Sequence, residues 1–381
     1  MTKRYFKNLN GIRFILATLV LIHHVAIVLQ VLQVSNLYNK IGALKAFGPV
    51  AVSLFFALSG FLITYLLLEE NKNTNTIVLK KFYLSRARRI LPLYYFIVII
   101  HLFILPYTPL ISMEHKLILM DANAYQYAAI PLQGWELNIW YLLLLPQVAL
   151  ALMVATGNTF VPAGHVWSIG VEEIFYFTYP VLLKKYIHKF RKLILSTIAI
   201  YYTLAILVFV IAQLVKMGYI TDIKILRIVN FSIILILYNR INCMVIGAVG
   251  AYLYFKRHKY YFTATQPKVF YASIIGILLL FAVGARVPFI THELYCILFT
   301  CVILYLIKDG KNYFLENAVF TYLGKISYGI YMYQMVVIFF ITHLCTKYHL
   351  HPLWVYPLSF VLTVLISAVS YEFIERKIMK K

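Results

Sequence analysis

The chain alternates between long apolar runs and short polar loops, most of which are basic. A helix needs about 20 apolar residues to cross a bilayer. Eleven runs approach or exceed this length, at 12–34, 50–69, 90–105, 138–155, 166–183, 192–215, 228–255, 269–285, 291–307, 320–345 and 353–375. The pattern predicts an all-α, polytopic integral membrane protein that forms a helical bundle in the lipid bilayer.

The basic loops predict the orientation of these runs. Most of the 35 lysines and arginines fall in loops that would share one side of the membrane, and basic loops stay cytoplasmic. The N-terminus then starts inside, residues 70–89 return inside, and the loop 106–137 lies outside. The basic residues from Arg376 onward place the C-terminus inside as well.

Two apolar runs lie between this outer loop and the next basic loop, which begins at Lys184. Only an odd number of crossings connects opposite sides, so one of the two runs does not cross. Run 138–155 contains Pro146 and Gln147 and leads into the uncharged loop 155–165. Irregular backbone is tolerated at membrane depth where it lines a cavity. We therefore expect a re-entrant or interfacial segment here, and about ten transmembrane helices in total, with both termini cytoplasmic.

Composition supports a membrane protein and limits the other classes. The 381 residues are 62% hydrophobic and 13% charged, with a mean hydropathy of +0.82. A net charge of +22 could indicate nucleic acid, but the basic residues follow the loops, so we expect no nucleic-acid partner. The four cysteines form no CxxC pair, and neither a disulfide framework nor a metal site is predicted.

The sequence shows no internal repeat, and the first run has no small-residue cleavage site. We therefore expect a retained first span and a single membrane domain over residues 1–381, with no soluble appendage.

Candidate chemistry begins in the first run, where RFILATLVLIHH places Arg13 and His24 on one helix face. An ionisable group at the bilayer centre costs about 2.5–3.5 kcal/mol, so it indicates function. His24 could act as a general base. Alternatively His24 is a packed histidine within the bundle, and Arg13 is an interfacial anchor. His23 points away from this face and is interpreted as a packing or secondary residue.

The second run contains FFALSGFLI, with Ser59 followed by Gly60. Small residues commonly let two membrane helices approach closely. Ser59 could instead contact substrate, although no GxSxG turn of a nucleophilic serine surrounds it.

The stretch KKFYLSRARRILPLYY carries Arg86, Arg88 and Arg89 directly before a span. Guanidinium groups bind phosphates with two parallel hydrogen bonds. The three arginines therefore predict a phosphate or pyrophosphate site, for which coenzyme A would fit. The alternative is that positive-inside charge alone explains them.

In HVWSIGVEEIFYFTYP, Glu172 and Glu173 lie inside an apolar run, and helical spacing places Glu172 beside Tyr176. A buried carboxylate needs a hydrogen bond, a proton or a counter-ion. One of the pair could orient a catalytic histidine, or the two could form a structural salt bridge with Arg240 or Arg13.

Arg240 falls near the middle of run 228–255, between Asn239 and Asn242. An arginine at this depth usually faces a polar cavity or a carboxylate. It could hold one of the two glutamates, or stabilise charge on a thioester or a sugar hydroxyl.

Together these stretches resemble the acyltransferase 3 family of integral membrane acyltransferases, in order and along nearly the whole chain. LNGIRFILATLVLIHHV is similar to the family's opening motif, FFALSGFLI and SRARRILPLYY to its next two, and VWSIGVEEIFY to its WSLxxEExFY motif. Arg240 with Gly247, LGKISYGIYMY and the terminal YEFIER resemble its later motifs.

Two departures from the family pattern stand out. Asn10 replaces a usual aspartate, which weakens a charge role at that position. Gln334 stands where the family often has histidine, so a second histidine is not expected to act there.

The resemblance implies transfer of an acyl group, usually acetyl, from cytoplasmic acyl-CoA to a hydroxyl of a cell-surface glycan or lipid-linked sugar, with no permanently bound cofactor. It implies a bacterial inner-membrane location and leaves open a separate periplasmic partner protein. The implied catalytic residues are His24 with Glu172 or Glu173. The implied donor-binding residues are Arg13, Arg86, Arg88 and Arg89. The implied substrate or charge-stabilising residues are Arg240, Trp167, Ser168, Tyr176 and Ser59.

Two alternatives to a complete acyltransferase stay open. In a proton-coupled transporter or flippase, the intramembrane arginine, glutamate and histidine residues would form a proton relay. A donor-side subunit would pass acyl groups to a partner protein instead of to the final acceptor.

Overall fold

The computed structural model describes residues 5–32, 34, 36, 37, 42–108, 110, 134–155, 163–284, 290–308 and 314–380. Every regular element within these residues is a helix, which confirms the all-α prediction. Most of the loops expected at 106–137 and 155–165 lie outside the described residues.

The chain divides into two compact units. Unit 1 contains Met1–Val78, Leu84–Leu93 and Cys243–Lys381, and unit 2 contains Leu79–Tyr83 and Tyr94–Asn242. Helix α4 (Leu79–Ile99) contributes residues to both units.

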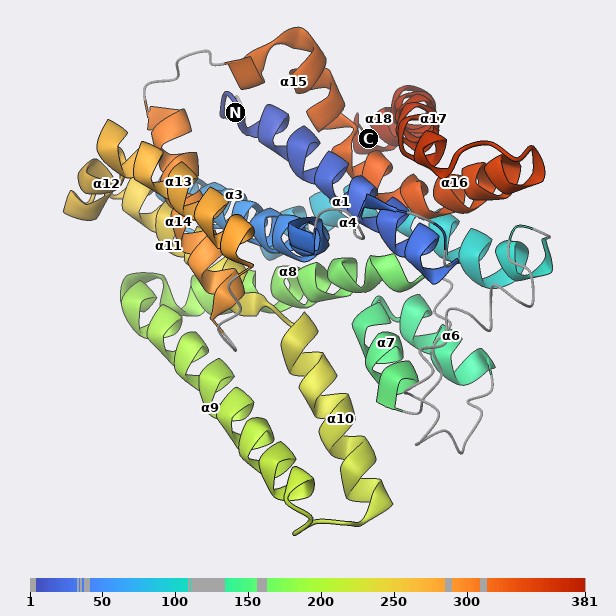
Figure 1. Ribbon diagram of the computed structural model, residues 1–381. Coiled ribbons are helices and arrows are strands. Elements are labelled where there is room, and N and C mark those ends of the chain that lie inside the picture. Colours follow the sequence, from blue (N-terminus) through green and yellow to red (C-terminus); the bar gives the residue numbers. More distant parts are fainter. Residues whose placement is uncertain are drawn as a thin grey trace. The chain divides into compact units, whose positions relative to one another are not determined.

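Unit 1 contains most of the helices from the two ends of the chain (Figure 1). Its α-helices besides part of α4 are α1 (Leu9–Val31), α3 (Phe47–Thr74), α11 (Ile241–Phe255, from Cys243 onward), α12 (Lys259–Ala264), α13 (Pro267–Val283), α14 (Thr291–Lys308), α15 (Ala318–Lys325), α16 (Ser327–Lys347), α17 (Val355–Ser370) and α18 (Arg376–Lys380). Short 3₁₀ turns lie at Gly42–Ala46, Phe314–Glu316 and Pro352–Trp354, and a π-helical turn, η9, at Tyr371–Glu375.

Helix α1 packs against α3, α15, α16 and α17 within unit 1. Ala17, Leu21 and Val25 repeat every four residues and form one buried face of α1, which shares a core with Ile330 and Val337 of α16. The four-residue spacing keeps these side chains on one face of the helix. One face of α1 thus packs into the core, and its other faces can carry polar side chains.

Two glycines allow a close backbone contact inside unit 1. A Cβ on Gly60 of α3 would lie 2.0 Å from the carbonyl oxygen of Met244, and one on Gly247 of α11 would lie 1.8 Å from that of Ala57. Neither position has room for a side chain. Close helix approach at Gly60, predicted from the sequence, is therefore confirmed.

Unit 2 contains the middle of the chain. Besides part of α4 it holds α6 (Gly134–Leu142), α7 (Pro146–Ala155), α8 (Trp167–Tyr186), α9 (Phe190–Lys216) and α10 (Ile223–Tyr238). A π-helical turn, η2, lies at Ile100–Ile104, and 3₁₀ turns lie at Leu105–Tyr107, Gly164–Val166 and Ile187–Lys189. Helices α9 and α10 form a hairpin (Figure 1).

Helix α9 has the surface of a membrane-exposed helix. Only four of its 27 residues are buried, namely Phe190, Leu193, Ile194 and Ala205. Large apolar side chains such as Ile200, Leu207 and Phe209 are 45–62% exposed. An apolar exposed surface of this kind suits contact with lipid.

The apolar run 138–155 is broken at Leu143–Leu145, where Leu144 has a φ of 62°. The two resulting helices, α6 and α7, have 9 and 10 residues. A crossing helix needs about 20 residues, so neither crosses alone. This agrees with the expectation that the run does not form a single span, while its re-entrant or interfacial placement stays a prediction.

The run 228–255 was expected to be one span with Arg240 near its middle. The stretch Lys224–Phe255 is long and apolar enough to cross a membrane, so its single crossing stays a prediction, but its helix is not continuous. Helix α10 ends at Tyr238, and α11 begins at Ile241. Asn239 has a ψ of 73°, which is not helical, so Arg240 lies in a break between helices of 16 and 15 residues. A polar side chain in such a break can help satisfy backbone groups that the helix no longer pairs.

Eight helical stretches among the described residues are long and apolar enough to cross a membrane. The stretches Gly164–Lys216 and Lys224–Phe255 each contain two helices, and the apolar helix Pro267–Val283 is slightly shorter. The chain is a polytopic integral membrane protein. Its number of crossings and the side of its termini stay predictions.

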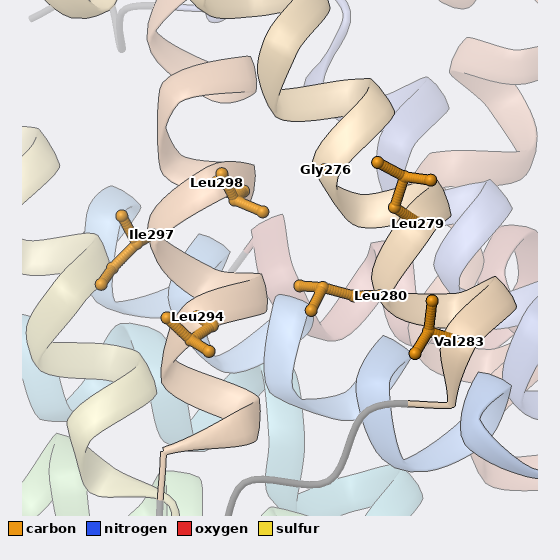
Figure 2. A pocket seen from close by; sticks show the side chains of 7 residues that line it. All are labelled: Gly276, Leu279, Leu280, Val283, Leu294, Ile297 and Leu298. Carbon is orange, nitrogen blue, oxygen red and sulfur yellow. The ribbon is translucent and has the colours of Figure 1, made fainter.

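An apolar groove runs between α13 and α14 in unit 1 (Figure 2). It encloses about 420 Å³, and its lining is Gly276, Leu279, Leu280, Val283, Leu294, Ile297 and Leu298. No ionisable or hydroxyl side chain lines it, so this groove offers no group for proton transfer.

We expect Gly247→Ala to destabilise the protein, because the added Cβ would overlap the Ala57 carbonyl oxygen. Overpacking of this kind costs about 1–3 kcal/mol, which should appear as a lower Tm in detergent. Gly276→Ala is the matched control, since its Cβ would meet only a Leu298 methyl group at 3.1 Å. Equal Tm values for the two variants would contradict the close contact.

Candidate active site

Arg13 and His24 lie on the uninterrupted helix α1. Their eleven-residue separation, about three turns, therefore keeps them on one face, as the sequence predicts. Nη1 of Arg13 donates a hydrogen bond to Oδ1 of Asn10 at 2.9 Å. Asn10, which replaces the aspartate usual in the family, thus supplies an acceptor for this arginine without adding a charge.

The side chain of Gln334, on α16, interacts with His24. Gln334 is fully buried, and its Nε2 donates to the carbonyl oxygen of Tyr331 at 2.9 Å. An amide oxygen is a group that can accept a hydrogen bond from an imidazole N–H. The other nitrogen of a neutral imidazole then carries the lone pair that a general base needs.

His23 faces a different neighbour. A Cβ at Gly48 of α3 would lie 2.1 Å from Cδ2 of the His23 ring, so the ring fills the space that a larger residue would occupy. The His23 and His24 rings are 5.6 Å apart between centroids. This close fit supports a packing role for His23.

Ser59 lies on α3, half-buried, beside the closely packed Gly60. The structure thus explains the glycine of this motif by packing. A substrate contact by Ser59 stays a prediction.

The three predicted donor-binding arginines lie in the part of α4 that belongs to unit 1. Arg86 is half-buried, whereas Arg88 and Arg89 are exposed. Arg89 interacts electrostatically with Glu375, a buried carboxylate near the C-terminus. An exposed guanidinium can bind an anion from solution.

Glu172 and Glu173 have different neighbours in unit 2. The hydroxyl of Tyr176 donates to Oε2 of Glu172 at 3.0 Å, which confirms the contact expected from their four-residue spacing. Glu173 instead interacts electrostatically with Tyr94 and Tyr95 of α4. Glu172 therefore has a neighbour on its own helix and Glu173 has neighbours on α4, so the two carboxylates are not equivalent.

Trp167 begins α8 and forms the centre of an aromatic and cationic cluster in unit 2. Its ring meets Tyr238 edge-to-face at 4.7 Å between centroids, and Cζ of Arg240 lies 5.6 Å from the ring. Nε of Arg240 also donates to the Leu237 carbonyl oxygen at 3.4 Å. A cation stacked on an aromatic face is stabilised by about 0.5–2 kcal/mol. Ser168, the next residue after Trp167, is buried.

The structure thus gathers the candidate residues into two groups, one in each unit. Unit 1 holds the predicted base, His24, the predicted donor-binding residues Arg13, Arg86, Arg88 and Arg89, and the predicted substrate residue Ser59. Unit 2 holds the remaining candidates, namely Glu172, Glu173, Tyr176, Trp167, Ser168 and Arg240. The pairing of His24 with one of the glutamates stays a prediction.

Several polar contacts have no counterpart in the sequence predictions. Gln334 was noted only as a departure from the family, yet it is a partner of His24. In unit 2, the buried rings of His101 and His165 lie 5.2 Å apart, and Nδ1 of His101 is 2.9 Å from the Ile97 carbonyl oxygen. The available signal for His165 was its position two residues before Trp167 in the sequence.

The chain is a membrane protein that carries ionisable side chains within helices long and apolar enough to cross a bilayer. Such side chains indicate a functional site. The acyltransferase domain model matches residues 6–372. The chain belongs to the acyltransferase 3 family, as its sequence motifs indicate.

Relatives of the chain include O-acetyltransferase OatA of Staphylococcus aureus (strain NCTC 8325 / PS 47), 26% identical over 396 residues, covering 99% of this chain and 58% of the relative. The putative O-acetyltransferase SACOL0978 of Staphylococcus aureus (strain COL) is 26% identical over 395 residues, with the same coverage of 99% and 58%. The chain therefore spans 58% of the length of these curated relatives. No solved structure matches the chain.

We expect Gly48→Ala to lower the Tm, because the new methyl group would overlap the His23 ring at a cost of about 1–3 kcal/mol. In a His23→Ala background the ring is gone, so the same change should have a much smaller effect. A thermal-unfolding cycle of the four proteins in detergent measures the difference. Equal effects of Gly48→Ala in both backgrounds would contradict the contact.

Proposed function

We propose that this protein is a membrane O-acyltransferase, specifically an O-acetyltransferase of a bacterial inner membrane. It would transfer an acyl group from cytoplasmic acyl-CoA to a hydroxyl of a cell-surface glycan or lipid-linked sugar. The observation that carries the proposal is a histidine inside a membrane helix, His24, which interacts with the buried amide of Gln334. The names of the relatives support the acetyl group and the oxygen acceptor.

In the proposed reaction, His24 removes the proton from the acceptor hydroxyl as its oxygen attacks the thioester carbonyl carbon. The tetrahedral intermediate collapses, the carbon–sulfur bond breaks, and the coenzyme A thiolate takes the proton back from His24. The products are an O-acyl ester and the free thiol. General-base catalysis of this kind contributes about 10²–10⁴-fold in rate.

Glu172 or Glu173 would stabilise the imidazolium form of His24, as the acid of a catalytic triad does. The two glutamates have different neighbours. Glu172 accepts a hydrogen bond from Tyr176, whereas Glu173 interacts electrostatically with Tyr94 and Tyr95. Arg240, stacked near Trp167, would stabilise the negative charge that develops on the thioester oxygen. Ser59, Ser168 and Tyr176 would line the substrate path. This assignment needs no metal ion or permanently bound cofactor.

The donor's phosphates would bind Arg13, Arg86, Arg88 and Arg89. Exposure of Arg88 and Arg89 supports this role, because an anion from solution can reach them. Arginine binds phosphate oxygens with paired N–H donors. The lipid bilayer would be the environment of the acceptor if that acceptor is a lipid-linked sugar.

A second candidate is a donor-side protein that passes the acyl group to a separate periplasmic protein. The match with this chain covers 58% of the length of the relative OatA. Transfer of label to a glycan by the purified protein alone would contradict this candidate.

We expect purified protein to release free thiol from acetyl-CoA slowly, and His24→Ala to reduce this rate about 100-fold. His23→Ala is the matched control, because it changes the adjacent histidine and should keep most of the activity. Thiol release is measured with a chromogenic disulfide reagent. Equal loss in both variants would contradict a specific role of His24, and no reaction or binding by wild type would favour the transporter alternative.

We expect Arg89→Ala to raise the KM for acetyl-CoA about tenfold, which corresponds to about 1.4 kcal/mol of donor binding, with little change in kcat. Lys72→Ala removes one exposed positive charge at the end of α3 and serves as the control. Initial rates at varied donor concentration measure both constants. An equal change in KM for the two variants would show that only overall charge matters.

A further inference from the structure

Four side chains at the N-terminal end of α1 form a continuous chain of hydrogen bonds within unit 1. Nη1 of Arg13 donates to Oδ1 of Asn10 at 2.9 Å, and Nδ2 of Asn10 donates to the hydroxyl oxygen of Tyr5 at 3.3 Å. The Tyr5 hydroxyl donates in turn to Oε1 of Glu316 at 2.7 Å. Glu316 is the last residue of the 3₁₀ turn η7 (Phe314–Glu316). The chain thus links a predicted donor-binding arginine to a carboxylate that has no role in the proposed function.

The chemistry of the two ends fixes the direction of this chain. A guanidinium only donates hydrogen bonds, and an ionised carboxylate only accepts them. Each group between Arg13 and Glu316 must therefore accept on one side and donate on the other. The amide of Asn10 and the hydroxyl of Tyr5 can both do this. An ionised aspartate at position 10 could accept from both neighbours but could not donate to Tyr5. Asparagine is therefore the residue type that extends the chain to Glu316.

The second oxygen of Glu316 is held at the start of α1. Oε2 of Glu316 accepts a hydrogen bond from the backbone N–H of Asn8, the residue that directly precedes α1. The side chain of Asn8 does not cap the helix and instead donates to the carbonyl oxygen of Leu306 at 3.0 Å. A negative charge near a helix N-terminus is also stabilised by the helix dipole. Both oxygens of Glu316 therefore have defined partners, and the carboxylate has a defined position.

Close backbone contacts hold the two segments of this chain together. A Cβ on Gly11 would overlap the carbonyl oxygen of Leu315, the residue before Glu316, and one on Gly324 would overlap the carbonyl oxygen of Asn10. Helix α1 packs against both η7 and α15. Asn10 is only 7% exposed, so water has little access to its amide. The backbone thus places the carboxylate and the amide at a fixed separation, which Tyr5 bridges.

We propose that Glu316 is a positioning residue that, through this chain, orients the Arg13 guanidinium for the phosphates of the acyl donor. Hydrogen bonds in such a chain polarise one another and are strengthened together. A guanidinium has five N–H donors, so it can bind the Asn10 amide and a phosphate at the same time. The carboxylate acts from a distance and does not compete with the phosphate for the guanidinium. This inference rests on the proposed function, because it assumes that Arg13 binds the donor.

The first test measures KM and kcat for acetyl-CoA with the purified full chain in detergent. Glu316→Gln leaves one side-chain oxygen for two donors, and Tyr5→Phe removes the bridging hydroxyl from a side chain that is 52% exposed. We expect each change to raise KM about fivefold, the effect of losing one ordinary hydrogen bond, with kcat nearly unchanged. Glu372→Gln is the matched control and should behave as wild type, because this exposed carboxylate pairs with Arg376 at 2.7 Å.

The second test uses Asn10→Asp to bypass the chain. An aspartate at this position can pair with Arg13 directly, so the orientation of the guanidinium no longer depends on the groups beyond it. In this background we expect Glu316→Gln and Tyr5→Phe to change KM by less than about twofold. An effect of Glu316 through its contact with Asn8 would persist in both backgrounds.

Melting curves show whether each variant is folded before its kinetics are compared. Tyr5→Phe also serves as the second variant in case Glu316→Gln does not fold, because it leaves the contact between Glu316 and the Asn8 N–H group in place.

Three results would overturn the inference. Normal KM values for folded Glu316→Gln and Tyr5→Phe, beside a raised KM for Arg13→Ala, would refute the role of Glu316 and leave the proposed function intact. Equal increases in KM with and without Asn10→Asp would show that Glu316 acts only by anchoring α1. A normal KM for Arg13→Ala, or no acetyl-CoA binding by wild type, would refute the donor role of Arg13 and with it this inference.

Discussion

The hydrocarbon interior requires that every backbone N–H and C=O group find a partner inside the protein, and this constraint limits where membrane helices can break. Helix α1 is uninterrupted and carries Arg13 and His24 within its regular backbone. Two irregular stretches carry an ionisable side chain: the α10–α11 break places Arg240 near the Trp167 ring, and the π-helical turn η9 ends at Glu375. The break between α6 and α7, in contrast, carries only leucine side chains at Leu143–Leu145.

A second consequence concerns how each ionisable group is held. Arg13 has Asn10, His24 has Gln334, and Glu172 has Tyr176 as a neutral partner. A neutral hydrogen-bond partner orients an ionisable side chain without fixing its charge. A residue that gains and loses a proton during a reaction needs this kind of support, whereas a salt bridge would favour one charge state. The contacts are those expected of a prepared reaction site.

The fold class could be predicted because the length and spacing of apolar runs report directly on membrane helices. The failure of run 138–155 to form one helix was also predictable, since Pro146 and Gln147 interrupt it. The break at Asn239 was not, because the run 228–255 is apolar on both sides and a single arginine can also occur inside an intact span. Irregular turns such as η9 do not change the spacing of hydrophobic residues, so the sequence pattern does not predict them.

Part of the candidate site could be predicted from the sequence, because some of its residues lie on the same helix. Arg13 with His24, and Glu172 with Tyr176, lie on single helices, so their spacing alone predicts that they share a face. Gln334 was missed as a neighbour of His24 because the two residues lie far apart in the sequence. Only the packing of α16 against α1 within unit 1 brings them together.

The central claim is that an acyl group enters as a cytoplasmic thioester and leaves as an oxygen ester on a glycan. Acetyl-CoA labelled in the acetyl group, supplied to inside-out and right-side-out vesicles that contain the protein, tests this most directly. The account predicts that label enters the glycan fraction only in inside-out vesicles, and that mild alkali releases it as acetate. Label that never reaches a glycan or protein ester, beside proton-coupled movement of an unmodified solute, would contradict it.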